Sequence, residues 1–211
     1  SAPQFEMREI NKDIHRAVRF VRSHAGDHGF DPQRIGITGS SAGGYLASWL
    51  GTTECAGNAA AADPVERASS QVQAVACFFP GNDWMNFLNP GEDVIAISER
   101  SGTITGFRFK EYEPKRREFI PLHDSEKVRE LLKELSPINH VTAQSAPMLF
   151  IFGDQDSLTP IRTQGTPMLE KLKAAGVPCD IIVKPGCGHS WPGIEKDSPS
   201  IADWFDKYLR K

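Results

Sequence analysis

The sequence has few of the features that assign a chain to a metal-binding, membrane or nucleic-acid-binding class. Its four cysteines form no CxxC pair, and no His/Cys spacing is typical of a zinc site. No apolar run approaches the roughly 18 residues that a transmembrane helix needs. The 24 basic residues are offset by 27 acidic residues, and no block of Lys or Arg stands apart from acidic neighbours. We therefore expect no metal ion, no membrane span and no nucleic-acid partner.

The cysteines and the N-terminus leave the cellular compartment open. Cys77 lies in an apolar run, which favours a buried thiol. A disulfide between Cys179 and Cys187 would require an oxidising compartment. No signal peptide is visible, because the chain opens with Ser-Ala-Pro-Gln-Phe and leads almost at once into a helix. Residue 1 is either the native start or a boundary within a longer protein.

Hydrophobic periodicity predicts one α/β domain over residues 1–211. Apolar residues recur with a helical period over residues 8–25 and 201–209, so an amphipathic helix is expected near each end. Further helices are expected from Ala42 onward and through Leu169 and Leu172, the second of them ending at Gly176. Short apolar runs predict strands at residues 34–38, 72–79, 147–152 and 179–183. Strands that alternate with helices predict a mostly parallel sheet with helices on both faces.

Residues 81–136 interrupt this alternation. The segment is long, charged and dotted with aromatic residues, and it contains one helical pattern near residues 125–135. Because a bare connection of this length is unusual in a compact domain, we interpret the segment as an inserted lid or cap.

A G-x-S-x-G motif lies between the first expected strand and the helix that follows it. The motif is Gly39-Ser40-Ser41-Ala42-Gly43, with Ser41 at its centre. A serine on such a sharp turn occupies a strained backbone position, and the glycines two residues away let strand and helix approach closely. The helix N-terminus points free N–H groups toward the serine, so we expect the Ala42 N–H to bind an oxyanion. The motif predicts Ser41 as a nucleophile.

A nucleophilic serine needs a histidine base and an orienting carboxylate, and both have candidates later in the chain. Asp154 and Asp156 follow the third expected strand, and His189 follows the fourth in a glycine-flanked loop. Both loops leave the carboxyl ends of parallel strands, where open α/β sheets place their ligands. We predict Asp156 as the acid, with Asp154 bracing the loop. The five other histidines are interpreted as surface or packing residues: His15, His24, His28, His123 and His140.

Three segments together resemble esterases of the α/β-hydrolase superfamily. Residues 31–47 (DPQRIGITGSSAGGYLA) are most similar to the acetyl-xylan-esterase-like and hormone-sensitive-lipase-like branches. The GDQD segment at 153–156 and the GCGHSW segment at 186–191 are similar to that family's acid and histidine loops, in the same order. The resemblance implies a Ser41–His189–Asp156 triad, acyl-enzyme chemistry, and neither a metal nor an organic cofactor.

The sequence departs from the family at its beginning. Family members carry several strands before the helix that opens this chain, and a His-Gly-Gly-type loop there supplies further oxyanion N–H groups. Residues 1–30 contain no such loop, because their only glycines are Gly26 and Gly29. The chain therefore resembles a family member shortened at its N-terminus. The strand at 34–38 would then be an unpaired sheet edge, and we expect it to pair with a second copy or with a missing segment.

Three functions remain open on these observations. The leading hypothesis is a serine hydrolase of short acetyl or aryl esters, with Ser40, Trp84 and Trp191 expected to contact the substrate. Ordinary packing is the alternative for the two tryptophans. A peptidase similar to prolyl oligopeptidases would use the same three loops on a different bond. The third hypothesis is an impaired or non-catalytic protein of the hydrolase fold, because removing one oxyanion donor typically costs about 100- to 1000-fold in rate.

Overall fold

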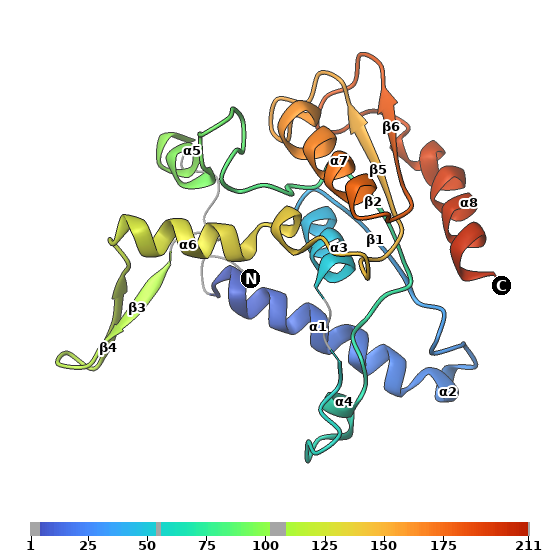
Figure 1. Cartoon of the computed structure of the whole chain (residues 1–211), viewed down its shortest axis with the longest axis horizontal. Coiled ribbons are helices and arrows are strands. Elements are labelled where there is room, and N and C mark those ends of the chain that lie inside the picture. The colour runs from blue at the N-terminus through green and yellow to red at the C-terminus, as the bar shows by residue number, and fades with distance from the viewer. Residues whose placement is uncertain (1–4, 54–55, 102–108, 211) are drawn as a thin grey trace.

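A four-stranded parallel sheet forms the centre of the computed structural model, which describes residues 5–53, 56–101 and 109–210. The sheet has the order β1-β2-β5-β6, and every neighbouring pair is parallel (Figure 1). Its strands are β1 (Gly36–Ser40), β2 (Ala74–Phe78), β5 (Met148–Gly153) and β6 (Cys179–Lys184). This arrangement confirms the expected mostly parallel sheet.

The first strand begins two residues later than the sequence predicts. Asp31 accepts hydrogen bonds from the Gln33 N–H and the Arg34 side chain, so the chain is still turning at residue 34. The Ile35 N–H donates to the side chain of Gln73 instead of a strand partner. Local side-chain hydrogen bonds of this kind compete with sheet pairing and delay the strand.

Helices cover both faces of the sheet, as expected. A Cβ atom on Gly51 of α3 (Ala42–Thr52) would meet the side chains of Val75 and Met148, so α3 packs on that face. A Cβ atom on Gly36 would instead meet Phe205 and Leu209 of α8 (Ser198–Leu209). Because Gly36 pairs with Ala74, one residue before Val75, these contacts lie on opposite faces. In Figure 1, α7 (Thr166–Ala174) lies on the α3 side of the sheet.

The two central strands are buried on both faces. Every residue of β5 is buried, and β2 is buried except for partial exposure of Phe78. Cys77 in β2 is completely buried, and burial raises the pKa of its thiol to about 12. The thiols of Cys179 and Cys187 are free, so the structure does not contain the disulfide considered above.

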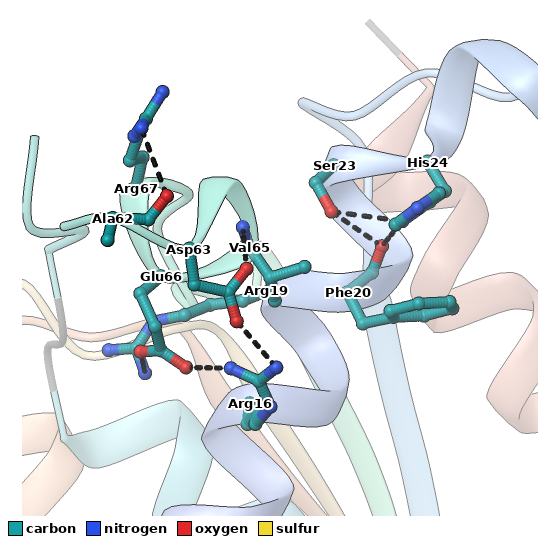
Figure 2. Close-up of polar contacts among 10 residues, drawn as sticks. All are labelled: Arg16, Arg19, Phe20, Ser23, His24, Ala62, Asp63, Val65, Glu66 and Arg67. Carbon is teal, nitrogen blue, oxygen red and sulfur yellow. Dashed lines mark hydrogen bonds and ion pairs between the residues drawn. The ribbon is translucent and has the colours of Figure 1, made fainter.

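The first helix contacts a short helix that precedes β2. The sequence predicts a helix over residues 8–25, and the structure has α1 (Met7–Ser23) followed by the short α2 (Ala25–His28). Arg16 of α1 pairs with Asp63 and Glu66, and Arg19 also pairs with Glu66 (Figure 2). Asp63 caps the N-terminus of α4 (Pro64–Arg67) by accepting from the Val65 N–H. These contacts attach α4 to α1.

The segment at 81–136 contains more regular structure than the sequence predicts. The expected helix is confirmed as α6 (Ser125–Leu135), and Asp124 caps its N-terminus. The structure adds α5 (Val94–Ser101) and an antiparallel hairpin of β3 (Lys110–Glu113) and β4 (Glu118–Pro121). In Figure 1 the hairpin projects away from the sheet beside α6. The interpretation of this segment as a lid stays a prediction, and part of it, residues 102–108, lies outside the described residues.

Two structural facts bear on the expected partners. In the described part of the chain, no helix is both long enough and apolar enough to cross a membrane. Among the described strands, β1 stands at one end of the sheet and pairs only with β2. Pairing of β1 with a second copy stays a prediction.

Candidate functional site

Ser41 occupies the turn that joins β1 to α3. Its backbone has φ 53° and ψ −116°, a region that residues other than glycine rarely adopt. The strand, the strained serine and the helix follow one another without an intervening residue. The Ser41 N–H donates to the Phe78 carbonyl at 3.1 Å, so the end of β2 holds the turn in place. The expected strand–turn–helix context of the motif is confirmed.

The close approach of strand to helix depends on Gly39 and Gly44 rather than on Gly43. A Cβ atom on Gly39 would overlap the backbone of Gly43, and one on Gly44 would lie 2.6 Å from the Phe78 carbonyl oxygen. A Cβ atom on Gly43 would meet nothing within 4 Å. The prediction that both motif glycines must lack a side chain is therefore wrong for Gly43. The strand residue Gly39 faces the backbone of Gly43. A side chain is therefore excluded at Gly39, in the strand, and not at Gly43, in the helix.

The residues on either side of Ser41 are both exposed. Ala42 is the first residue of α3, so its N–H has no carbonyl partner within the helix. The partial positive charge of the helix N-terminus adds to that donor, which makes the position suitable for an anion. Ser40 is the last residue of β1 and pairs with Phe78. The roles predicted for Ala42 and Ser40 toward a substrate stay predictions.

The structure brings Ser41, His189 and Asp156 together in one hydrogen-bonded chain. The Nε2 atom of His189 lies 2.8 Å from the Oγ atom of Ser41. The Nδ1 atom of His189 lies 2.9 Å from the Oδ2 atom of Asp156. Because a carboxylate only accepts, Nδ1 carries a proton and Nε2 is left to accept from the serine hydroxyl. This tautomer is the one that can remove a proton from Ser41.

The carboxylate of Asp156 is buried and is held by several hydrogen-bond donors. Its side chain is 0% exposed, and its Oδ1 atom accepts from the N–H groups of Leu158 at 2.8 Å and Thr159 at 3.0 Å. Burial by itself would raise the pKa of Asp156. The hydrogen bonds from His189 and from these two N–H groups outweigh burial and hold that pKa below its ordinary value. Asp156 is therefore ionised at neutral pH.

Asp154 has a different position. Its carboxylate accepts from the Gly186 N–H at 2.7 Å, which joins the loop after β5 to the loop after β6. A Cβ atom on Gly153 would overlap the backbone of residues 187 and 188, so the two loops are in direct contact. This arrangement agrees with the bracing role expected for Asp154.

The aromatic ring of Phe79 lies beside the imidazole of His189, and Trp191 packs behind Phe79. The ring of Phe79 is 4.4 Å from the His189 ring, and the ring of Trp191 packs edge-on against Phe79. The indole N–H of Trp191 donates to Asp197, and Trp191 is 9% exposed. Phe79 has φ 35°, which is strained for a bulky residue. The Phe79 ring therefore covers part of the imidazole, and Trp191 supports that ring.

Trp84, the other tryptophan predicted to contact substrate, lies in a buried hydrophobic cluster that is separate from the core around the sheet. It is 6% exposed, and its indole N–H donates to the Leu135 carbonyl. Its ring stacks on Phe87 and packs edge-on against Tyr45. These contacts are those of a packing residue, and a role in substrate binding stays a prediction.

His15 belongs to a separate polar cluster between α1 and α3. Its Nδ1 atom lies 2.7 Å from the Ser70 hydroxyl, and its Nε2 atom accepts from the Trp49 indole at 3.2 Å. Burial, together with the positive charge of Arg19, lowers the pKa of His15 to about 4. His15 is thus a neutral packing residue at physiological pH, in agreement with its interpretation from the sequence.

The described residues contain no group of three or more His, Cys, Asp or Glu side chains that could hold a metal ion. The side chains of the site carry the groups that acyl transfer needs. A serine hydroxyl hydrogen-bonded to a neutral imidazole can act as a nucleophile toward an acyl carbon. An exposed helix N-terminus next to it can stabilise the negative charge that develops on the acyl oxygen.

Sequence reasoning missed two residues of this site, Thr159 and Phe79. The Thr159 hydroxyl lies 2.9 Å from Asp156 Oδ2, and the Phe79 ring contacts His189. Phe79 ends an apolar run and therefore gives the pattern of a core residue. Thr159 lies three residues after the predicted acid. A threonine this close to an aspartate can hydrogen-bond to its carboxylate, and this spacing was the sequence signal that could have identified Thr159.

Comparisons with known proteins agree with this geometry. The BD-FAE family model matches residues 5–172. Esterase LipQ of Mycobacterium tuberculosis is 30% identical over 148 residues, which are 70% of this chain and 30% of LipQ. The acylamino-acid-releasing enzyme of Arabidopsis thaliana is 28% identical over 190 residues, which are 85% of this chain and 20% of that enzyme. The chain thus spans a third or less of the length of these relatives.

A solved structure shows the same fold. The acetyl ester-xyloside bifunctional hydrolase from Caldicellulosiruptor lactoaceticus superposes with a TM-score of 0.71 at 25% identity. The superposition covers 99% of this chain and 66% of that protein. The sheet, the helices on both faces and the connecting loops described above therefore follow the architecture of that hydrolase.

Proposed function

The chain belongs to the BD-FAE family within the α/β-hydrolase superfamily, and we propose that it is a carboxylic ester hydrolase that works through Ser41, His189 and Asp156. The observation that carries the proposal is the continuous hydrogen-bonded chain from Ser41 Oγ through His189 to Asp156. The names of LipQ as an esterase and of the solved neighbour as an acetyl ester hydrolase support it.

Ser41 attacks the ester carbonyl carbon in the first half of the reaction. As the Oγ–C bond forms, the serine proton passes to His189 Nε2, and the carbonyl π electrons move onto oxygen. Collapse of the tetrahedral intermediate breaks the bond to the alcohol oxygen, which takes the proton from His189. The alcohol leaves, and the acyl group remains on Ser41. Water then repeats the steps with His189 as base and releases the acid.

Asp156 acts on His189 and not on the substrate. Its carboxylate fixes the proton of the imidazole on Nδ1 and stabilises the imidazolium that forms during attack. The depressed pKa of Asp156 keeps the carboxylate charged at neutral pH. The burial of this carboxylate strengthens its interaction with the cation, because little water screens it.

The N–H of Ala42 is the proposed donor to the oxyanion. Its place at the start of α3 directs both a hydrogen bond and the helix dipole at the developing charge. Removing one donor from such a site typically costs about 100- to 1000-fold in rate. The alternative of a protein with impaired turnover is therefore distinguished by kcat, which would lie about 100- to 1000-fold below that of an esterase with a complete set of oxyanion donors.

Short acyl esters are the proposed substrates, with acetyl esters first. The solved neighbour is named as an acetyl ester-xyloside hydrolase, which favours acetyl groups. A second candidate is an acyl-peptide hydrolase, which the likeness to an acylamino-acid-releasing enzyme favours. Both candidates pass through an acyl-enzyme on Ser41. The ester hydrolase would carry an acetyl group there and release an alcohol, whereas the peptidase would carry an N-acylaminoacyl group and release an amine.

The experiment is a kinetic comparison on p-nitrophenyl esters of increasing acyl length, with an N-acetyl-peptide anilide assayed in parallel. We expect the acetate to have the highest kcat/KM and Ser41→Ala to abolish turnover of every ester. Ser198→Ala removes an exposed serine hydroxyl on α8 and serves as the control with wild-type rates. Ester hydrolysis that is unchanged in Ser41→Ala would overturn the proposal, and faster cleavage of the anilide would favour the peptidase.

A further inference from the structure

Thr159 contacts both members of the proposed acid–base pair through one buried hydroxyl. It lies at the end of the loop after β5, just before the π-helical turn Ile161–Gly165, and is 6% exposed. Its Oγ1 atom lies 2.9 Å from Asp156 Oδ2 and 3.2 Å from His189 Nδ1. A third contact, at 3.1 Å, joins the same oxygen to the Phe79 carbonyl. The hydroxyl is therefore at the junction of three loops.

The single proton of this hydroxyl has only two acceptors. His189 Nδ1 already carries the proton that it donates to Asp156, so it cannot accept from Thr159. The Asp156 carboxylate at 2.9 Å and the Phe79 carbonyl at 3.1 Å remain. A charged acceptor forms the stronger hydrogen bond, which favours Asp156. The Oγ1 lone pairs then face the Nδ1–H group and reinforce its position.

We propose that Thr159 is a positioning residue, whose hydroxyl orients the Asp156 carboxylate and the His189 imidazole for proton transfer from Ser41. The inference deepens the proposed function and rests on it. Asp156 Oδ2 receives one bond from His189 and one from Thr159, and Oδ1 receives two from backbone N–H groups. The carboxylate is thus fixed from both oxygens, and rotation of its plane would break bonds at each of them.

The Thr159 hydroxyl also lies against the backbone of Phe79, whose ring packs on His189. The Phe79 N–H donates to the Ile151 carbonyl at 2.8 Å, and its carbonyl faces Thr159. Because the positive φ of Phe79 is strained, the surrounding contacts have to maintain it. The same residue packs its ring 4.4 Å from His189. Thr159 therefore contacts the imidazole at Nδ1 directly and lies against the backbone of the residue whose ring packs on the imidazole.

The test compares Thr159→Val with Thr159→Ser in the full chain. Valine keeps the size of the side chain and removes the hydroxyl, and we expect kcat to fall about 10-fold with KM within about twofold of wild type. This factor corresponds to the low end of the free energy of a hydrogen bond to a charged group. Serine keeps the hydroxyl, and we expect it to restore most of kcat.

Thr163→Val is the matched control. Thr163 is a second buried threonine four residues along, and its hydroxyl donates to the Phe87 carbonyl at 2.6 Å without touching His189 or Asp156. We expect this variant to unfold at a lower temperature than wild type and to keep its kcat. Comparison of the two valine variants separates the effect of removing any buried threonine hydroxyl from the effect of removing the hydroxyl that contacts Asp156 and His189.

A second readout does not depend on turnover. The proton on His189 Nδ1 gives a far-downfield proton NMR signal, and Thr159→Val should shift or broaden it, whereas Thr163→Val should leave it in place. A wild-type kcat with an unchanged signal in Thr159→Val would overturn the inference, and so would a Thr159→Ser variant as slow as the valine. If Ser41→Ala showed that the proposed function is wrong, the NMR signal would still report whether Thr159 orients the pair.

Discussion

The Nε2 atom of His189 lies 2.8 Å from the Oγ atom of Ser41, although 148 positions separate the two residues in the chain. The contact depends on two strands that are not neighbours in the sheet, because Ser41 follows β1 and His189 follows β6. Parallel strands bring their carboxyl ends to one edge, and the loops there can reach across the intervening strands. The sheet is therefore the scaffold that sets the geometry of the site.

Replacement of Asp156 by asparagine should reduce activity without removing the nucleophile. The amide can donate to Nδ1 and so favour the tautomer with its proton on Nε2, which cannot accept from Ser41. We expect kcat to fall by about 1,000- to 10,000-fold with little change in KM. Steady-state kinetics at pH 7 measure this, and Asp154→Asn is the control, since Asp154 contacts Gly186 and not His189. An equal loss in both variants would contradict the assignment of the acid.

The two motif glycines should respond in opposite ways to alanine. A Cβ atom on Gly39 would overlap the Gly43 backbone, so Gly39→Ala should destabilise the protein by about 2 to 3 kcal/mol. The space around Gly43 is open and its backbone is helical, so Gly43→Ala should be neutral or stabilise by about 0.5 kcal/mol. Denaturant unfolding of both variants measures the difference. Equal destabilisation would show that the strand does not approach Gly43 as described.

Stability should fall on mild acidification because of His15. The pKa of His15 in the folded protein is about 4, below its ordinary value of 6.5, so between these values the unfolded chain binds more protons. The contribution of His15 to the free energy of unfolding is therefore fully present above pH 6.5 and is lost as the pH falls toward 4. We expect a loss of about 1 to 2 kcal/mol, less than the full shift implies, since the imidazole is partly exposed. His15→Gln should flatten the pH dependence of unfolding over this range, and an unaltered slope would contradict this role of His15.

The free side of β1 should mediate association. Among the described strands β1 has one paired side only, and its central Thr38 is exposed. We expect static light scattering to give the mass of two chains at micromolar concentration. Thr38→Lys should shift the protein toward one chain, because an edge lysine disfavours pairing. A wild-type protein that is monomeric at its working concentration would contradict the prediction.

Sequence patterns predict the parts of this structure that periodic burial determines. The strands β2 and β5 are continuous apolar runs, and residues 125–135 show a helical pattern, so the sequence predicts β2, β5 and α6 near their observed positions. The hairpin β3–β4 was missed because its side chains are largely exposed, and Tyr112 and Phe119 contact each other on the surface. No burial pattern marks such a hairpin.

For the site, three signals were used to predict that Ser41, His189 and Asp156 meet: the G-x-S-x-G motif, loops that leave the carboxyl ends of parallel strands, and the resemblance of the three segments to the esterase family. The contacts of Thr159 and Phe79 were not predictable in this way. Thr159 meets Phe79 across 80 positions of the chain, and a local pattern carries no information about such a pair. The same limit explains the wrong prediction for Gly43, because only the three-dimensional backbone shows which glycine must lack a side chain.

The proposed function depends above all on whether Ser41 is an activated nucleophile. Labelling of the intact protein with a fluorophosphonate, followed by mass spectrometry of the peptide that contains residues 40 and 41, measures this. We expect one label per chain, on Ser41, and a labelling rate that falls at least about 100-fold in His189→Ala. A protein that takes up no label, or one labelled on Ser40 instead, would show that Ser41 is not the nucleophile.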